Sequence, residues 1–142
     1  PPLNVYFSGY KTMQGFEGYY MMRKMGCPFL LIAEPRLEGG SFYMGNEEYE
    51  KALADIIRKH MKELGFQNNQ VILSGLSMGT YGALYYGCDI LPHAMILGKP
   101  LARLKGMASS YNLVISRTAT ALRSPKTEWM VSISFKTSCG AE

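Results

Sequence analysis

Strand-like and helix-like patterns of apolar residues alternate along the first hundred positions of the chain. Leu3 to Phe7 alternates toward a strand, and Cys27 to Ala33 is a continuous apolar run, as expected of a strand covered on both faces. Two further short apolar runs, Val71 to Leu73 and His93 to Leu97, predict strands of the same kind.

Helical segments separate these strands. Apolar residues between Met13 and Met25 form one helix face, and Gly26 marks the C-terminal end of this helix. Asn46 predicts the N-cap of a second helix that runs to about Leu64, and an Ala/Leu/Tyr-rich helix follows Gly79. Strand–helix alternation with short loops implies an α/β fold with a parallel sheet and helices on both faces.

The turn before the third helix carries a motif with chemical meaning. Gly75-Leu76-Ser77-Met78-Gly79 matches G-x-S-x-G between a strand and a helix, the context of the nucleophile elbow in α/β hydrolases. Such a turn holds the serine strained, and a Cβ on either flanking glycine would strike the adjacent strand or helix. We therefore predict Ser77 as a nucleophile; the alternative is a Gly/Ser-rich turn without chemistry.

A second piece of the same chemistry is expected at the end of the first strand. An oxyanion hole in this fold uses the backbone N–H of the residue after the nucleophile, here Met78, and one from an earlier strand-to-helix loop. Ser8-Gly9-Tyr10-Lys11 occupies the place of that loop, and the amide of Tyr10 or Lys11 is the predicted second donor. The alternative is a plain turn at a glycine.

A serine nucleophile needs a base, usually a histidine oriented by a carboxylate, in the chain order Ser, acid, His. His60 precedes Ser77 and reads as a packed or surface residue of a helix. His93 opens a strand and should lie at the sheet end opposite the elbow. None of the carboxylates after Ser77 precedes a downstream histidine, so the triad acid and histidine are expected outside this chain.

Charge and composition exclude several other classes of protein. The net charge of +4 comes from the last forty residues, where basic residues are scattered singly, so a nucleic-acid partner is not expected. The three cysteines show no metal-ligand or CxxC spacing, which predicts free thiols, no metal and no cofactor. No apolar run approaches the length of a membrane span, and no signal peptide is recognisable at the start.

Four segments carry a resemblance to a known family: Tyr6 to Tyr10, Glu34 to Tyr43, Ser74 to Gly87, and Gly98-Lys99-Pro100. Over Leu3 to about Ala102 the chain resembles the hydrolase-like domain of the accessory Sec system protein of the second Asp type, from Gram-positive bacteria. Ser77 matches the serine of that family. The resemblance implies an α/β-hydrolase-like fold similar to carbohydrate esterases, with the C-terminal part of the fold missing or divergent here.

The resemblance also implies a function. The family exports serine-rich-repeat glycoprotein adhesins with sibling accessory Sec proteins and a SecA-type ATPase, and is credited with O-acetylating N-acetylglucosamine on the adhesin. A serine-dependent carbohydrate O-acetyltransferase at the cytoplasmic face of the membrane is therefore expected of the full-length protein, while this chain alone is expected to be inactive. The alternative is a non-catalytic scaffold in the secretion complex with a vestigial serine.

The chain is expected to divide near Ala102. Residues 1–102 read as the N-terminal portion of the hydrolase-like domain, with the nucleophile elbow. Residues 103–142 are Ser/Thr/Arg-rich without a clear period, although Thr127 to Phe135 alternates weakly toward a strand. This segment reads either as a truncated or out-of-frame tail or as a divergent cap. A start without methionine directly before a strand also favours a piece of a longer protein.

Overall fold

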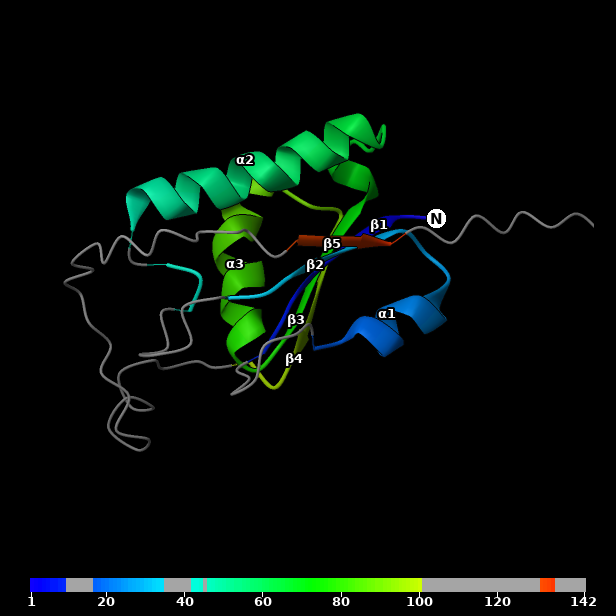
Figure 1. Cartoon of the computed structure of the whole chain (residues 1–142), viewed down its shortest axis with the longest axis horizontal. Helices are drawn as coiled ribbons and strands as arrows, with labels where there is room; N and C mark the ends of the chain where they lie inside the picture. The colour runs from blue at the N-terminus through cyan, green and yellow to red at the C-terminus, as the bar shows by residue number, and fades with distance from the viewer. Residues whose placement is uncertain (10–16, 35–41, 45, 101–130, 135–142) are drawn as a thin grey trace, which may run out of the picture.

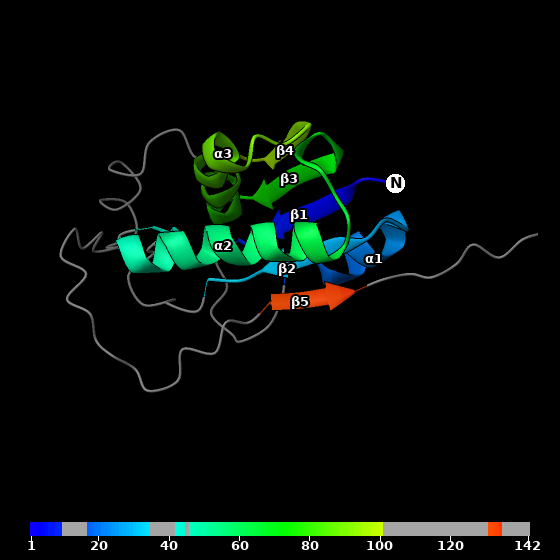
Figure 2. The same cartoon turned by 90° about the horizontal axis from the view of Figure 1, so that it is seen from above.

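Among the residues that the computed structural model describes, 1–9, 17–34, 42–44, 46–100 and 131–134, five strands form one sheet in the order β4-β3-β1-β2-β5 (Figure 2). Four strands run parallel: β1 (Leu3–Phe7), β2 (Phe29–Ile32), β3 (Val71–Leu76) and β4 (Ala94–Gly98). The fifth, β5 (Val131–Ser134), pairs antiparallel with β2 at the edge. The predicted α/β fold with a parallel sheet is confirmed.

Helices cover both faces of the sheet, as the alternation predicts. Helix α1 (Tyr19–Met25) lies on one side, and α2 (Glu47–Glu63) lies on the other (Figure 1). Helix α3 (Met78–Ile90) packs on the same face as α2, and a single 3₁₀ turn, η1 (Asn68–Gln70), leads from α2 into β3.

The two cores follow from the two-residue period of the strands. Along β1, the side chains of Leu3, Val5 and Phe7 enter the larger core beneath α2 and α3. Tyr6 points to the other face, where it packs with Met22 of α1 and with residues of β2. Every residue of β1 and β2 is buried, so both faces of these strands are covered, which explains the continuous apolar run in β2.

Helix boundaries differ from the sequence expectation at one place. Helix α1 begins at Tyr19, whereas the apolar pattern predicted a helix from Met13; residues 10–16 lie outside the described part. Gly18 has a φ of 85°, and a Cβ there would meet the ring of Tyr6. This left-handed residue fixes the helix start because an α-helix cannot pass through that backbone conformation.

Elsewhere, the predicted ends of helices and strands agree with the structure within a few residues. The Asn46 side chain accepts a hydrogen bond from the Tyr49 N–H at 3.0 Å, as expected of an N-cap. Gly26 and Gly65 close their helices with φ of 67° and 73°. Strand β3 extends to Leu76, three residues beyond the apolar run that announced it. In the part of the chain that is described, no helix combines the length and apolarity needed to cross a membrane.

Candidate active site

Ser77 forms a sharp turn between β3 and α3. Its backbone angles are φ 54° and ψ −119°, a combination that residues with a Cβ rarely adopt. The turn is held from both sides: the Ser77 N–H donates to the Gly98 carbonyl at 2.9 Å, and the Ser77 carbonyl accepts from Thr80 N–H at 3.0 Å and Thr80 Oγ1 at 2.6 Å. The strained turn at the end of the strand matches the geometry that the motif predicted.

The flanking glycines are required by close backbone packing. A Cβ on Gly75 would overlap the backbone of Gly79 at the start of α3. A Cβ on Gly79 would overlap the carbonyl oxygen of Phe7 at the end of β1 and lie 3.0 Å from that of Ser8. The first turn of α3 is thus pressed against the carboxyl end of β1, as the sequence motif implied.

The turn places the N-terminus of α3 directly after Ser77. Met78 is the first residue of α3, where backbone N–H groups have no acceptor within the helix and the helix dipole is positive. The end of β1 lies next to the turn, since a Cβ on Gly9 would be 3.0 Å from the Leu76 carbonyl oxygen. The Gly9 N–H donates to the Glu17 carboxylate. Tyr10, the predicted second oxyanion donor, lies outside the described residues, as does Lys11.

Next to Ser8 lies a buried tyrosine, Tyr43, to which the sequence analysis assigned no role. Tyr43 is fully buried, and its hydroxyl donates to the Ser8 carbonyl at 2.6 Å, with the Ile32 carbonyl at 3.2 Å. Its N–H donates to Oε2 of Glu34 at 2.9 Å, and its carbonyl accepts from the Tyr86 hydroxyl at 2.7 Å. One residue thus connects the ends of β1 and β2 with α3.

The same burial determines the protonation of this tyrosine. Removal from water raises the pKa of the Tyr43 phenol well above its ordinary value, and neighbouring groups including Tyr49 and Glu34 raise it further. On the other face, burial and then Glu17 raise the pKa of Tyr6 to about 12. Both hydroxyls therefore stay protonated, and Tyr43 remains a hydrogen-bond donor across the physiological pH range.

Neither histidine is brought to the nucleophile. His93 precedes β4 and its N–H donates to the Val71 carbonyl at the start of β3, which is the end of the sheet opposite Ser77. His60 lies in the last turns of α2, with Nδ1 3.2 Å from Oε2 of Glu63. The predicted position of His93 is confirmed. Asp89, a carboxylate after Ser77, is exposed and forms an ion pair with Arg58.

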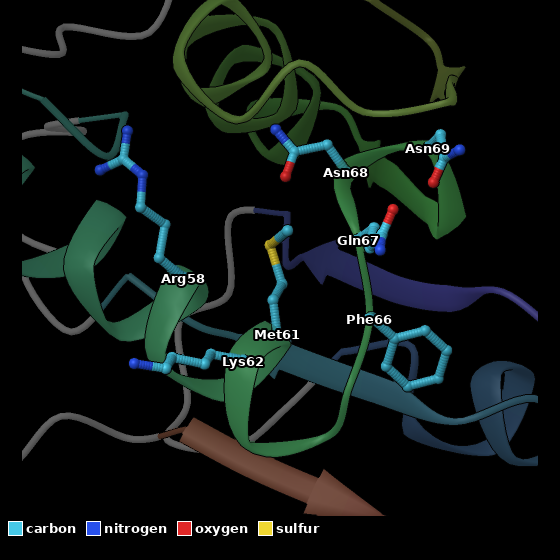
Figure 3. A pocket seen from close by; sticks show the side chains of 7 residues that line it. All are labelled: Arg58, Met61, Lys62, Phe66, Gln67, Asn68 and Asn69. Atoms are coloured by element: carbon cyan, nitrogen blue, oxygen red, sulfur yellow. The ribbon is translucent and has the colours of Figure 1, made fainter.

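A hollow of about 610 Å³ lies away from the elbow, between the end of α2 and η1 (Figure 3). Its lining includes Arg58 and Lys62 from α2 and Asn68 from η1. The Asn68 side chain already donates to the Ile90 carbonyl at 2.7 Å, and Arg58 is paired with Asp89. No cluster of His, Cys, Asp or Glu suited to a metal occurs among the described residues. Cys27 and Cys88 are free thiols, as expected.

Sequence reasoning missed Tyr43 and Glu34 for a physical reason. Both follow β2, and the Tyr43 N–H reaches the Glu34 carboxylate across nine positions of sequence, a spacing that no helix or strand period encodes. Phe42 and Tyr43 have φ of 52° and 65°, values that an apolar pattern does not signal. The available signal was a carboxylate and a large aromatic residue on either side of a glycine-containing stretch after a buried strand.

Comparison with known proteins identifies relatives over most of the chain. Residues 1–122 match the family model described as the accessory Sec system GspB-transporter, the second of the Asp proteins. The chain is 55% identical over 114 residues to the second Asp protein of the accessory Sec system of Staphylococcus aureus (strain NCTC 8325 / PS 47), covering 80% of this chain. It is 59% identical over 108 residues to the protein of that name from Streptococcus gordonii, covering 76% of this chain.

The chain corresponds to only part of these relatives. It spans 22% of the staphylococcal protein and 21% of the streptococcal protein. A solved structure, the Glycosylation Associate Protein (Gap123) complex from Streptococcus agalactiae, is similar with a TM-score of 0.70 and 44% identity, over 84% of this chain and 26% of that one. The family match extends to residue 122, beyond Ala102, where the resemblance read from motifs ends.

Proposed function

This chain belongs to the family of the second Asp protein of the accessory Sec system, and we propose that it carries the nucleophile of a serine-dependent acyltransferase acting on sugar hydroxyls. The observation that carries the proposal is the backbone of Ser77, at φ 54° and ψ −119° between two glycines where an added Cβ would overlap neighbouring backbone atoms. A strained turn of this kind projects a hydroxyl from the end of a strand beside helix N–H donors.

The reaction would proceed in two balanced steps. The Ser77 oxygen attacks the carbonyl carbon of an acyl donor, its proton passes to a base outside the described residues, and the donor's leaving group departs with a proton. The oxyanion that forms between these events would be held by the Met78 N–H and a donor from the loop after β1, for which Tyr10 is proposed. A sugar hydroxyl then attacks the acyl-serine, which yields the sugar ester and restores the serine.

The cellular role proposed for the full-length protein follows from its relatives. They are named as accessory Sec system proteins, and the similar solved structure is titled a glycosylation-associated complex. We therefore place the proposed acyltransferase in the export of serine-rich-repeat glycoprotein adhesins, at the cytoplasmic face of the membrane. Its partners would be sibling accessory Sec proteins and the SecA-type ATPase, and its acceptor N-acetylglucosamine on the adhesin.

A non-catalytic scaffold in the same complex is the second candidate. It is favoured by the position of both described histidines, which lie away from Ser77. A scaffold, however, has no need of a backbone conformation that costs about 1–3 kcal/mol to hold. The strained elbow therefore favours the enzyme.

The test is Ser77→Ala in the full-length protein. It removes one hydroxyl and leaves the turn intact, so turnover of a small acetyl ester and O-acetylation of the adhesin should fall by about 10³-fold or more. The matched control is Ser74→Ala, which removes a buried hydroxyl three residues earlier, bonded to Asn4 rather than placed at the turn. Retention of more than about a tenth of the turnover by Ser77→Ala would support the scaffold instead.

Transport is the second readout of the same experiment. Because the substitution leaves the packing of β3 and α3 unchanged, Ser77→Ala protein should still bind its accessory partners and support adhesin export. An export defect as severe as that of a full deletion would show that acylation and export are coupled.

A further inference from the structure

We propose that Thr80 is a positioning residue for the acyl-transfer reaction: its hydroxyl holds the Ser77 carbonyl and so keeps the Ser77 side chain from capping helix α3. The inference rests on the proposed function of Ser77. It extends that function to a buried side chain in the first turn of α3 that is neither the nucleophile nor an oxyanion donor.

The first observation is the pair of hydrogen bonds that Thr80 makes to Ser77. The Ser77 carbonyl accepts the Thr80 N–H at 3.0 Å and the Thr80 hydroxyl at 2.6 Å, so the hydroxyl makes the shorter contact. Any residue except proline would supply the N–H at this position, whereas the hydroxyl is specific to a threonine or a serine. Thr80 is fully buried, so water does not reach its side chain to replace this donor.

The second observation is the conformation that Ser77 avoids. Serine is among the best N-cap residues, and in an ordinary cap the backbone is extended while the side-chain oxygen accepts the N–H of the second or third helical residue. Asn46 forms such a cap on α2, with φ −148° and ψ 118°, and accepts the N–H of Tyr49, the third residue of that helix. Serine in the same role at position 77 would tie its reactive oxygen into the helix.

Ser77 departs from this ordinary cap in both its backbone and its side chain. Its backbone lies at φ 54° and ψ −119°, and among the described residues its side chain accepts no capping hydrogen bond. Thr80 is the third residue of α3, but its N–H bonds to the Ser77 carbonyl instead of the Ser77 side chain. The bonds from Thr80 to the carbonyl thus leave the Ser77 oxygen available for reaction.

The third step compares the two conformations of the turn. A strained backbone persists only while the surrounding contacts favour it. Contacts between backbone atoms, such as the Ser77 N–H to the Gly98 carbonyl at 2.9 Å, are present whatever side chain stands at position 80. The net contribution of one neutral hydrogen bond shifts an equilibrium by up to about ten-fold. Loss of the Thr80 hydroxyl should therefore move Ser77 from the reactive turn to the ordinary cap.

The experiment compares Thr80→Val with Thr80→Ser in the full-length protein, using a chromogenic acetyl ester. Valine keeps the branched shape and loses the hydroxyl, whereas serine keeps the hydroxyl and loses a buried methyl group. Thr80→Val should lower kcat by about ten-fold with KM nearly unchanged, because fewer molecules hold Ser77 in the reactive turn. Thr80→Ser should lower the unfolding temperature, through the small cavity that it leaves, and keep kcat within about two-fold of wild type.

A crystal structure of the Thr80→Val protein gives a readout that does not depend on activity. In this variant the φ of Ser77 should become negative, and the Ser77 side-chain oxygen should accept the N–H of residue 80. Ser77 retained at a φ near 54° would overturn the inference. Full kcat of Thr80→Val would also overturn it, as would an equal loss of kcat in Thr80→Ser.

If Thr80→Val does not fold, Thr80→Ala takes its place, since it differs from Thr80→Ser by the hydroxyl oxygen alone. A difference in kcat of about ten-fold is then expected between these two variants, and equal values would refute the proposal. Ser77→Ala, assayed in parallel, reports separately on the proposed function. If Ser77→Ala stays active, the reaction has been misassigned, while the φ of Ser77 in the variant without the hydroxyl still decides whether Thr80 holds the turn.

Discussion

Ser77 keeps backbone angles that a residue with a Cβ adopts only at an energetic cost of about 1–3 kcal/mol. Hydrogen bonds at both of its backbone polar atoms offset this cost. The Ser77 N–H donates to the Gly98 carbonyl at the end of β4, and the Ser77 carbonyl accepts from Thr80 in the first turn of α3. Thr80 contributes two donors, its N–H and its hydroxyl, to the same carbonyl. These hydrogen bonds therefore hold the strained backbone conformation of Ser77 in place.

A substitution of Gly79 tests how tightly the first turn of α3 packs against β1. Gly79→Ala places a methyl group on the Phe7 carbonyl, a backbone atom that cannot rotate away, so it should destabilise the protein by about 3 kcal/mol. The matched control is Gly26→Ala, where φ is 67° but no atom lies within 4 Å. That change should cost only the left-handed strain, about 1 kcal/mol. Chemical denaturation measures both, and equal losses would show that helix and strand can move apart.

At the level of elements, the strands and the elbow were readable from the sequence because their signals are local. Apolar runs located β1 to β4, and glycines bracketing Ser77 located the turn. The start of α1 was not readable, since it depends on the ring of Tyr6 lying over Gly18. The weak alternation near residue 131 did correspond to a strand, although its antiparallel pairing with β2 could be recognised only from the structure.

The residues around Ser77 were also predictable to different degrees. Ser77, Gly75 and Gly79 follow from a motif, whereas Tyr43 reaches Ser8 across 35 positions of sequence. No periodicity of the sequence encodes a contact over that separation. The local backbone geometry of the turn was thus predictable, and the long-range contacts around it were not.

Helix α2 carries a prediction at the element scale. Asn46→Ala removes the oxygen that accepts the Tyr49 N–H, so it should lower the free energy of unfolding by about 1 kcal/mol. Asn46→Asp is the matched control, because it keeps an accepting oxygen and adds a charge favoured at a helix N-terminus. Thermal unfolding of the three proteins tests the idea. An Ala variant as stable as the Asp variant would mean that packing of α2, and not its cap, fixes the helix start.

Across the whole molecule, the order of the strands indicates where a ligand would bind. The chain moves from β1 to β2 on one side and then returns to place β3 on the other side of β1. The order therefore reverses between β1 and β3, and ligands in open α/β sheets bind outside the carboxyl ends of strands at such a point. The carboxyl ends of β1 and β3 carry Ser8 and Ser77 respectively. Topology and motif thus indicate the same location independently.

The edge of the sheet formed by β4 leads to a prediction for the 142-residue chain in isolation. Strand β4 lies at this edge, and near it Leu91, Met95 and Ile96 are 68%, 45% and 54% exposed. Exposed apolar edge strands pair with other chains, so the isolated chain should self-associate. Ile96→Lys places a charge on this edge and should shift the chain toward the monomer in size-exclusion chromatography. An unchanged elution profile for this variant would place the contact elsewhere.

The isolated chain should also be catalytically silent. A serine hydroxyl is a poor nucleophile until a neighbouring base takes its proton, and neither His60 nor His93 lies near Ser77. Oxyanion donors alone leave about 10³–10⁴-fold catalysis over water. A chromogenic acetyl ester and a serine-reactive phosphonate provide the assay, with Ser77→Ala as the blank. Stoichiometric labelling of Ser77 with steady turnover would require a base within this chain, and His93→Ala would be the first variant to examine. Because His93 lies beside Val71, at the far end of β3 from Ser77, we expect neither stoichiometric labelling nor steady turnover.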